Sequence, residues 1–299
     1  MRNVATRGAP LVLLAAAAVA PATTTFVFAN SSSGDQFTYN NSLFPSFRSG
    51  QGLTNGQGWS YNNVGANASV GIRGTQSWMQ RSGNGSLVFT SPNNNGKADA
   101  ELYTNPNINF LGARTPSLSP ANSLGLLGDL THLSYDWYRD SSSTVPNHLH
   151  PVLRLFVWDQ ANNRSGYIVY EGVYNGFNTA AVDAWQTVDV LGLNARMWST
   201  GTALPFTGEY YTENIRISNW IANFASLHVM GVSVGVGSGW NGTFLGAVDN
   251  VTVGFNGNFT TYNFEVTAIP ADPVPEPFTM GLVGAAALVA LKRRRAKKA

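Results

Sequence analysis

The chain has 299 residues, is 43% hydrophobic and only 11% charged, and contains no cysteine. The missing cysteines exclude disulfide bonds, thiolate zinc sites and a cysteine nucleophile. The net charge of +2 comes from the two ends of the chain, because residues 30–270 hold ten Lys/Arg against fourteen Asp/Glu, a net charge of −4. A mildly acidic body argues against a nucleic-acid partner, since phosphate binding requires a basic surface.

The first 29 residues have the composition of a secretory signal peptide. Arg2 and Arg7 precede the apolar run Leu11–Ala20, and small residues follow at candidate cleavage sites after Ala22 or Ala29. A buried N-terminal helix is the alternative. The signal predicts export from the cytoplasm, with signal peptidase as a partner. The low charged fraction suits a protein outside the cell, where hydroxyls and amides cover the surface.

Residues 30–268 predict one all-β domain. Apolar residues alternate with polar ones at Leu133, Tyr135 and Trp137, and further strands are expected in PVLRLFVWD, GYIVYEGVY, AWQTVDVL, LHVMGVSVGVG, FLGAVDNVTVGF and TTYNFEVTAI. Gly-, Asn-, Ser- and Pro-rich clusters separate these runs as turns and loops. Many short strands in a chain of this length predict a two-sheet β-sandwich with a single core.

Two of the predicted strands suggest a ligand-binding face. If Leu133, Tyr135, Trp137, Leu153, Leu155 and Val157 point to the core, the side chains that point outward are Asp136, Tyr138, Arg154, Phe156 and Trp158. If the two strands are neighbours, aromatic rings and charged groups share one surface, as in many sugar-binding sites. The alternative is that loops or another strand cover these rings.

Trp240 is a further candidate for stacking on a sugar. It stands in the glycine-rich run Gly237–Gly242, which matches the spacing G-x-G-x-x-G but is followed by a strand pattern instead of the helix that dinucleotide binding requires. We therefore expect a hairpin loop that displays Trp240 at its tip.

The sequence predicts no catalytic site. Ser233 matches G-x-S-x-G but lies inside an alternating strand, where no nucleophile elbow forms. Glycoside hydrolysis needs two carboxylates about 5–10 Å apart, and the pairs Glu209/Glu213 and Asp136/Asp140 form no recognisable motif. The chain is expected not to be an enzyme, and a glycoside-active sandwich remains the less favoured alternative.

The C-terminal 31 residues have three parts: a Pro-rich linker at 269–277, an apolar run at 278–291 and a basic tail at 292–299. The apolar run spans about 21 Å as a helix, so it needs its flanks to cross a hydrocarbon core of about 30 Å. By the positive-inside rule the basic tail stays in the cytoplasm. The run is therefore predicted to be a short transmembrane helix.

Val274-Pro275-Glu276-Pro277, the apolar helix and the terminal KRRR together resemble the PEP-CTERM sorting signal of Gram-negative bacteria. The resemblance implies that an exosortase in the inner membrane recognises Pro275-Glu276-Pro277 and processes the chain nearby. It further implies that the freed protein moves to the cell surface or the extracellular matrix. An ordinary tail anchor is the alternative.

The body resembles jelly-roll carbohydrate-binding modules and concanavalin-type lectin domains through GQGW, GTQS, AWQTVDV and AVDNVTV. That resemblance implies a jelly-roll sandwich with exopolysaccharide as a weakly bound partner. It also implies a structural calcium held by Asp249, with Asp35 and Asn250 as companions, and no other cofactor. A turn-capping role is the alternative for Asp249, and a structural matrix protein without a ligand site is the alternative for the whole chain.

Overall fold

The computed structural model describes residues 22–93, 95–200 and 215–268. The chain divides into two units after Thr267, and all of the strands described below belong to the first. Most of the predicted signal peptide, the Val274–Pro277 motif, the apolar run and the basic tail lie outside the described residues. None of the described helices is long and apolar enough to cross a membrane.

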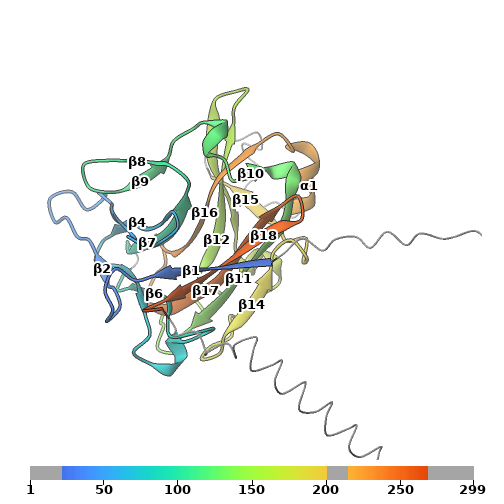
Figure 1. Cartoon of the computed structure of the whole chain (residues 1–299). Helices are drawn as coiled ribbons and strands as arrows, with labels where there is room; N and C mark the ends of the chain where they lie inside the picture. The colour runs from blue at the N-terminus through green and yellow to red at the C-terminus, as the bar shows by residue number, and fades with distance from the viewer. Residues whose placement is uncertain (1–21, 94, 201–214, 269–299) are drawn as a thin grey trace, which may run out of the picture. The chain divides into compact units, whose positions relative to one another are not determined.

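Two eight-stranded sheets form the domain (Figure 1). Sheet A contains β1 (Ala22–Phe28), β2 (Phe37–Thr38), β5 (Ser69–Arg73), β6 (Ser86–Ser91), β11 (Leu130–Arg139), β14 (Gln186–Asp189), β17 (Phe244–Phe255) and β18 (Asn258–Glu265). Sheet B contains β3 (Ser49–Gly52), β4 (Trp59–Gly65), β7 (Lys97–Tyr103), β10 (Gly125–Leu126), β12 (Val152–Asp159), β13 (Arg164–Tyr170), β15 (Met197–Ser199) and β16 (His228–Val236).

The remaining elements are small. A separate hairpin pairs β8 (Pro106–Ile108) with β9 (Arg114–Pro116), and α1 spans Ile217–Asn223. Single 3-10 turns occur at Ser77–Met79, Pro120–Asn122, Leu127–Asp129 and Gly172–Asn175. The prediction of an all-β, two-sheet sandwich is confirmed for the described residues.

Strand order explains how the sheets are built. Sheet A runs β1-β18-β17-β6-β5-β2, and β11 pairs with the other edge of β17 and then with β14. Sheet B runs β15-β13-β12-β16-β7-β4-β3, with β10 also on β16. The chain moves between the sheets after every one to three strands, so strands that follow one another in sequence often lie in different layers (Figure 1).

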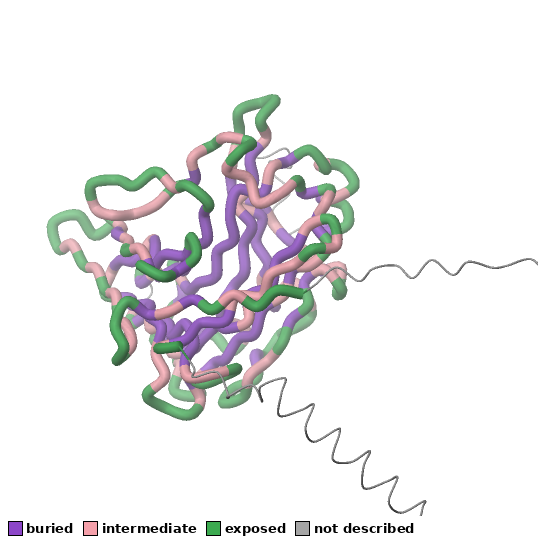
Figure 2. Tube along the Cα trace, in the orientation of Figure 1, coloured by how far each residue is buried: buried purple, intermediate pink, exposed green. Residues whose placement is uncertain are grey.

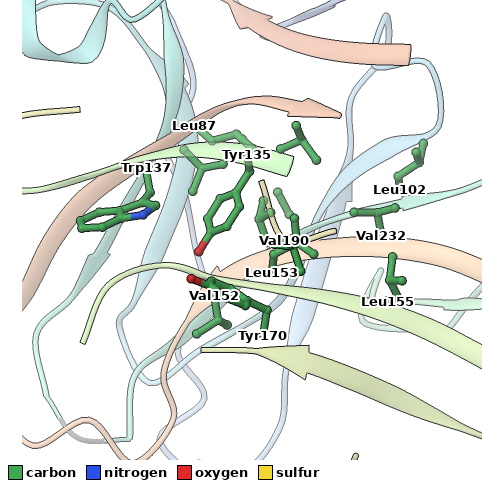
Figure 3. Close-up of a cluster of buried hydrophobic side chains, with 14 of the residues drawn as sticks. Leu87, Leu102, Tyr135, Trp137, Val152, Leu153, Leu155, Tyr170, Val190 and Val232 are labelled. Carbon is green, nitrogen blue, oxygen red and sulfur yellow. The ribbon is translucent and has the colours of Figure 1, made fainter. Parts of the chain in front are cut away.

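The core lies between the sheets, because the alternating pattern gives each sheet one apolar face. Tyr135 and Trp137 of β11 meet Leu153 and Leu155 of β12 there, and all four are at most 2% exposed (Figure 3). The buried strands form a continuous interior, while the connecting loops carry most of the exposed chain (Figure 2). The inward positions predicted for both strands are thus confirmed.

Strand β1 overlaps the end of the predicted signal peptide. It pairs in parallel with β18 over its whole length, and Val27 and Ala29 are buried in the core. Cleavage after Ala29 would remove this strand, whereas cleavage after Ala22 would leave it in the mature domain. Of the two predicted cleavage sites, only the first preserves the edge of sheet A.

Candidate functional site

The structure separates the two strands that were predicted to form one ligand face. Strand β11 belongs to sheet A and β12 to sheet B, so Asp136 and Tyr138 cannot share a surface with Arg154, Phe156 and Trp158. Both strands turn their apolar residues toward the common core, and their other faces therefore point in opposite directions. The predicted single face is wrong for this reason.

On sheet B the predicted residues are largely covered. Arg154 is 8% exposed and Trp158 6% exposed. The Arg154 guanidinium donates to Asp99 Oδ1 at 2.8 Å and to Ser233 Oγ at 3.3 Å. Lys97 lies 3.3 Å from the other oxygen of Asp99. A buried guanidinium that is paired with Asp99 in this way is not placed to contact a ligand in solvent.

A second carboxylate completes this buried network. Glu101 is fully buried and accepts hydrogen bonds from the hydroxyls of Tyr167 at 2.8 Å and Tyr103 at 3.0 Å, and also from the Asn62 amide. Burial, and then the charge of Asp99, raises the pKa of Glu101. The ring of Phe156 packs edge-on against both tyrosines. We interpret the outer face of sheet B as a structural polar network.

Trp240 is not displayed at a loop tip. Only 7% of it is exposed, and its ring packs edge-on against Phe244 at the rim of the core, with the centroids 5.1 Å apart. Indole has a large apolar surface, and burying that surface against the core is more favourable than leaving it in water. The glycine-rich loop therefore folds back so that Trp240 packs on the core. The predicted sugar-stacking position is therefore covered.

The outer face of sheet A carries a group of aromatic rings that we call the aromatic platform: Trp78, Tyr138 and Trp185. Trp78 stacks on Tyr138 with the centroids 4.9 Å apart and 13° between the rings, and Trp185 leans on Tyr138 at 5.8 Å. The Trp185 indole N–H donates to the carbonyl of Trp78 at 2.9 Å. Both tryptophans remain partly exposed, so the platform is accessible from solvent.

A charged pair lies beside the platform. The Arg81 guanidinium donates to Asp136 Oδ2 at 2.8 Å and lies 6.0 Å from the centre of the Trp185 ring. Thr187 donates to the other oxygen of Asp136 at 2.6 Å, and the Asn250 amide donates to Oδ2 at 2.8 Å. The side chain of Arg81 is 35% exposed. Its Nη2 also donates to the Thr187 hydroxyl at 3.4 Å. The guanidinium is thus fixed in orientation by Asp136 and Thr187 and stays partly exposed to water.

The backbone places these groups through an irregularity in β17. The pairing of β11 with β17 shifts between Ser134 and Asp136, and Asn250 has a φ of 50°. A bulge of this kind turns a side chain that would otherwise follow the pleat. Here the bulge brings the Asn250 amide to both Asp136 and Ser82, whose hydroxyl it reaches at 2.6 Å. It ties the segment 74–85, which connects β5 to β6, onto the sheet.

Asp249, the predicted calcium ligand, lies in the same region. It is completely buried opposite Asp136, and burial is the largest cause that raises its pKa to about 8. Its Oδ1 accepts the Phe264 N–H at 3.0 Å, but its Oδ2 has no hydrogen-bond partner. A buried carboxylate oxygen without a donor calls for either a proton or a cation.

The predicted companions of Asp249 do not complete a cation site. The oxygens of Asp35 are occupied by the N–H groups of Asn30 and Ser31 and by the Tyr61 hydroxyl, at 2.8–3.0 Å. Asn250 presents its N–H₂ group, a donor, to its neighbours. The assignment of Asp35 and Asn250 is therefore wrong on the chemistry of their contacts.

Two other residues fit better. Asn263 Oδ1 and Glu265 Oε1 are also buried without hydrogen-bond partners, and both residues belong to β18 beside Asp249. Phe264, between these two residues, donates its N–H to Asp249 Oδ1 at 3.0 Å, and the charge of Glu265 contributes to the raised pKa of Asp249. The described residues hold no group of three or more His, Cys, Asp or Glu arranged for a metal. Two carboxylates and one amide oxygen nevertheless suit calcium, which prefers oxygen ligands.

A separate hollow of about 330 Å³ lies near the turn between β17 and β18. Its lining includes Phe255, Phe259 and Tyr262 with Leu124 and Thr260. No charged side chain is part of its lining. Thr23, Asn258 and Thr260 add polar groups to it. Among the described residues we prefer the aromatic platform, because there a positioned arginine lies beside partly exposed indoles.

Comparison with known proteins gives the fold only. No protein-family model matches the chain, and no curated protein matches its sequence. Among solved structures, a family 11 carbohydrate-binding module from Clostridium thermocellum, in complex with a β-1,3-1,4-mixed-linked tetrasaccharide, is similar over 70% of this chain and 91% of that chain, with a TM-score of 0.34 and 9% identity.

Two further structures are similar to this chain. One belongs to the carbohydrate-binding modules of the β-sandwich superfamily (TM-score 0.30, 11% identity, 65% of this chain and 56% of that chain). The other is an arabinose-bound α-L-arabinofuranosidase (TM-score 0.29, 13% identity, 75% of this chain and 28% of that chain). These similarities describe a β-sandwich and carry no argument about what this chain binds.

Proposed function

We propose that the protein is an exported, exosortase-sorted protein of a Gram-negative cell surface or extracellular matrix that binds polysaccharide weakly. The sorting part of the proposal rests on the sequence: the N-terminal signal peptide, the motif Val274–Pro277, the apolar run at 278–291 and the basic tail. In this proposal the chain is held transiently in the inner membrane with its C-terminus in the cytoplasm. The jelly-roll-like sandwich is the part that is released.

The binding part rests on one observation. Two partly exposed indoles, Trp78 and Trp185, lie beside an arginine that Asp136 holds in place. Sugar rings stack their C–H faces on such indoles, and a fixed guanidinium can donate to their hydroxyls. A shallow platform of this size favours weak binding to a repeating polymer over tight binding to a small molecule.

We propose binding without catalysis because the carboxylates beside Arg81 are not accessible, and Asp183, which accepts the Tyr138 hydroxyl at 3.3 Å, is exposed but has no accessible carboxylate partner among them. Asp136 is 5% exposed and already accepts hydrogen bonds from Arg81, Thr187 and Asn250, and Asp249 and Glu265 are completely buried. Glycoside hydrolysis needs one carboxylic acid and one carboxylate that both reach the scissile bond. A structural matrix role without a ligand site remains the competing proposal, and the platform variants decide between them.

The test of binding is retention on the exopolysaccharide of the source organism. We expect Trp185→Ala and Trp78→Ala to lower affinity roughly tenfold each, since truncating a central aromatic anchor commonly costs more than 1 kcal/mol. Phe110→Ala is the matched control, because Phe110 is 87% exposed and lies on the separate β8–β9 hairpin. Unchanged retention of both tryptophan variants would contradict the platform.

Sorting is tested by mass spectrometry of the protein recovered from the cell surface. We expect a mature form that begins after Ala22, because this keeps β1 in sheet A, and that ends near Pro275–Pro277. Glu276→Ala should leave the chain in the inner membrane. A surface form whose sequence still ends at Ala299 argues against exosortase processing.

A further inference from the structure

Two loops expose an unusual amount of apolar surface. We call them the apolar loops: residues 41–48, which lead into β3, and residues 108–114, which join β8 to β9. The described residues contain eleven exposed large hydrophobic side chains, and five of these lie in the two loops: Leu43 (81%), Phe44 (54%), Phe47 (37%), Ile108 (60%) and Phe110 (87%). These include the three most exposed of the eleven. Concentrated apolar exposure of this kind marks an interaction surface.

The two loops share one corner of the domain. The hydroxyl of Ser49, directly after the first loop, donates to the carbonyl of Leu111 at the tip of the second. Gly112 has a φ of 79°, and a Cβ on it would lie 2.4 Å from the carbonyl oxygen of Gly50. Both loops project on the same side of sheet B, away from the buried strands (Figure 1 and Figure 2).

Polar side chains hold the backbone of both loops, and in the first loop Phe44 and Phe47 also stack on each other with their ring centroids 4.9 Å apart. In the first, the Asn41 side chain accepts the N–H groups of Leu43 and Phe44, and Arg48 donates to the carbonyls of Pro45 and Phe47.

In the second loop, Asn109 accepts the N–H groups of Leu111 and Ala113, and Arg114 donates to the carbonyl of Gly112. The backbone is therefore held by an asparagine at the start and an arginine at the end of each loop, and the apolar side chains remain exposed to a partner.

The charges of the corner indicate the kind of partner. Residues 39–50 and 104–118 contain two arginines, Arg48 and Arg114, and no Asp or Glu, although residues 30–270 as a whole carry a net charge of −4. The corner is thus a locally basic part of an acidic body. It complements a negatively charged surface.

The shape of the corner favours lipid over protein. The apolar side chains stand on the tips of two loops, where a rigid partner would bury only their ends unless it had two matching pockets. A bilayer admits separate apolar tips into its acyl region while arginines at the loop bases remain at the headgroups. We propose that the apolar loops dock the domain on an anionic lipid bilayer.

The absence of cysteine gives a direct test in the full chain. Phe110→Cys and Leu43→Cys each create one labelling site for an environment-sensitive fluorophore, and Leu193→Cys, at a 51% exposed position after β14, is the control. The probe surface is vesicles of phosphatidylethanolamine and phosphatidylglycerol, compared with vesicles of phosphatidylcholine. We expect a blue shift and a several-fold rise in emission at positions 110 and 43 on the anionic vesicles, and none at position 193.

Several outcomes overturn the proposal. One is the absence of any spectral change at positions 110 and 43, and another is an equal change at position 193, which would mean general adsorption through the apolar C-terminal run. A change that follows protein concentration without vesicles would show that a second copy of the chain covers the loops. An equal response on phosphatidylcholine would remove the electrostatic part. Polysaccharide retention by Trp185→Ala is a separate readout, so the two proposals fail independently.

Discussion

On the outer face of sheet B, Arg154 and Asp99 contact each other with at most 8% of either residue exposed, whereas on the outer face of sheet A the side chain of Arg81 stays 35% exposed while it holds Asp136. In both pairs a guanidinium nitrogen lies 2.8 Å from a carboxylate oxygen. The contact is the same and the surroundings differ. Water can replace a lost partner of Arg81 on sheet A, but it cannot replace a lost partner of Arg154 on sheet B.

This difference has a structural source. Over sheet B, the backbone N–H and carbonyl of Arg114 in the β8–β9 hairpin are both hydrogen-bonded to the Asn62 side chain. The hydroxyls of Tyr103 and Tyr167 donate to Glu101 and cover it. Over sheet A, the segment 74–85 covers only part of the face and presents Trp78 and Arg81 at its edge. A covered polar face therefore supports the fold, and a partly covered one is available to a ligand.

The largest expected effect separates these two roles. Arg154→Met should lower the free energy of unfolding by about 3–5 kcal/mol, because it leaves the buried Asp99 carboxylate without its main partner. Arg81→Met is the matched control and should cost less, about 1 kcal/mol, because Thr187 and Asn250 still donate to the buried Asp136 after Arg81 is removed. Urea denaturation measures both. Equal losses for the two variants would mean that the faces do not differ in the way that their burial indicates.

The second expected effect concerns Asp249, the buried exception within sheet A. A carboxyl whose pKa is raised to about 8 keeps a proton that the unfolded chain, with a pKa near 3.8, has already lost. Its contribution to stability is thus complete below pH 3.8 and disappears as the pH rises toward 8. We expect wild type to lose about 3 kcal/mol more than Asp249→Asn between pH 5 and pH 8, at about 1.4 kcal/mol for each pKa unit.

Calcium provides the second half of this experiment. A cation held by Asp249, Asn263 and Glu265 would replace the proton, so an excess of calcium should raise the melting temperature of wild type at pH 8 and remove most of its pH dependence. Asp249→Asn and Glu265→Gln should both reduce that shift. Adding a chelator should lower the melting temperature of wild type at pH 8 again and bring back its pH dependence. A melting temperature that calcium does not change would leave Asp249 as a protonated structural acid.

Periodicity allowed the elements of the fold to be predicted but not their neighbours. The alternation in 130–139 and 152–159 correctly gave two strands and their inward residues. It contained no information on which sheet each strand joins, because side-chain alternation is the same whether the next strand pairs with the first or crosses to the other layer. The twelve-residue connection 140–151 crosses between the sheets, and that crossing separates Asp136 from Arg154.

The candidate site was partly within reach of the sequence. Asp136 and Tyr138 were identified from strand alternation, and Asp249 from the resemblance to jelly-roll modules. Asn263 and Glu265 were missed, although they alternate with the buried Phe264 in the last strand, a signal that could have placed them on one outward face. Trp78 and Arg81 could not be assigned, because the segment 74–85 has no periodicity and its position depends on contacts such as that of Ser82 with Asn250. The bulge at Asn250 likewise arises from pairing and not from composition.

A smaller expected effect concerns Arg81 on the partly covered outer face of sheet A. Arg81→Gln keeps a donor of similar reach but removes the charge, so we expect a several-fold loss of polysaccharide affinity with a stability change below about 1 kcal/mol. The affinity of wild type should also fall as salt increases when the polysaccharide is acidic, and Arg81→Gln should lose this dependence. Quantitative retention at two salt concentrations measures both. A loss of stability larger than the loss of affinity would assign Arg81 to the fold instead of the site.

The smallest expected effect compares two hydroxyls. Thr187→Val removes one of the hydrogen bonds to Asp136, and because Thr187 is exposed, water can take its place, so the cost should stay below about 0.5 kcal/mol. Ser233→Ala removes the corresponding acceptor of Arg154 in sheet B, where Ser233 is 1% exposed and a donor is left unpaired, so the cost should be about 1–2 kcal/mol. Because each change is nearly isosteric, packing contributes little to either value. Equal costs would mean that water reaches Arg154, and the outer face of sheet B would then have to be considered as a second ligand surface.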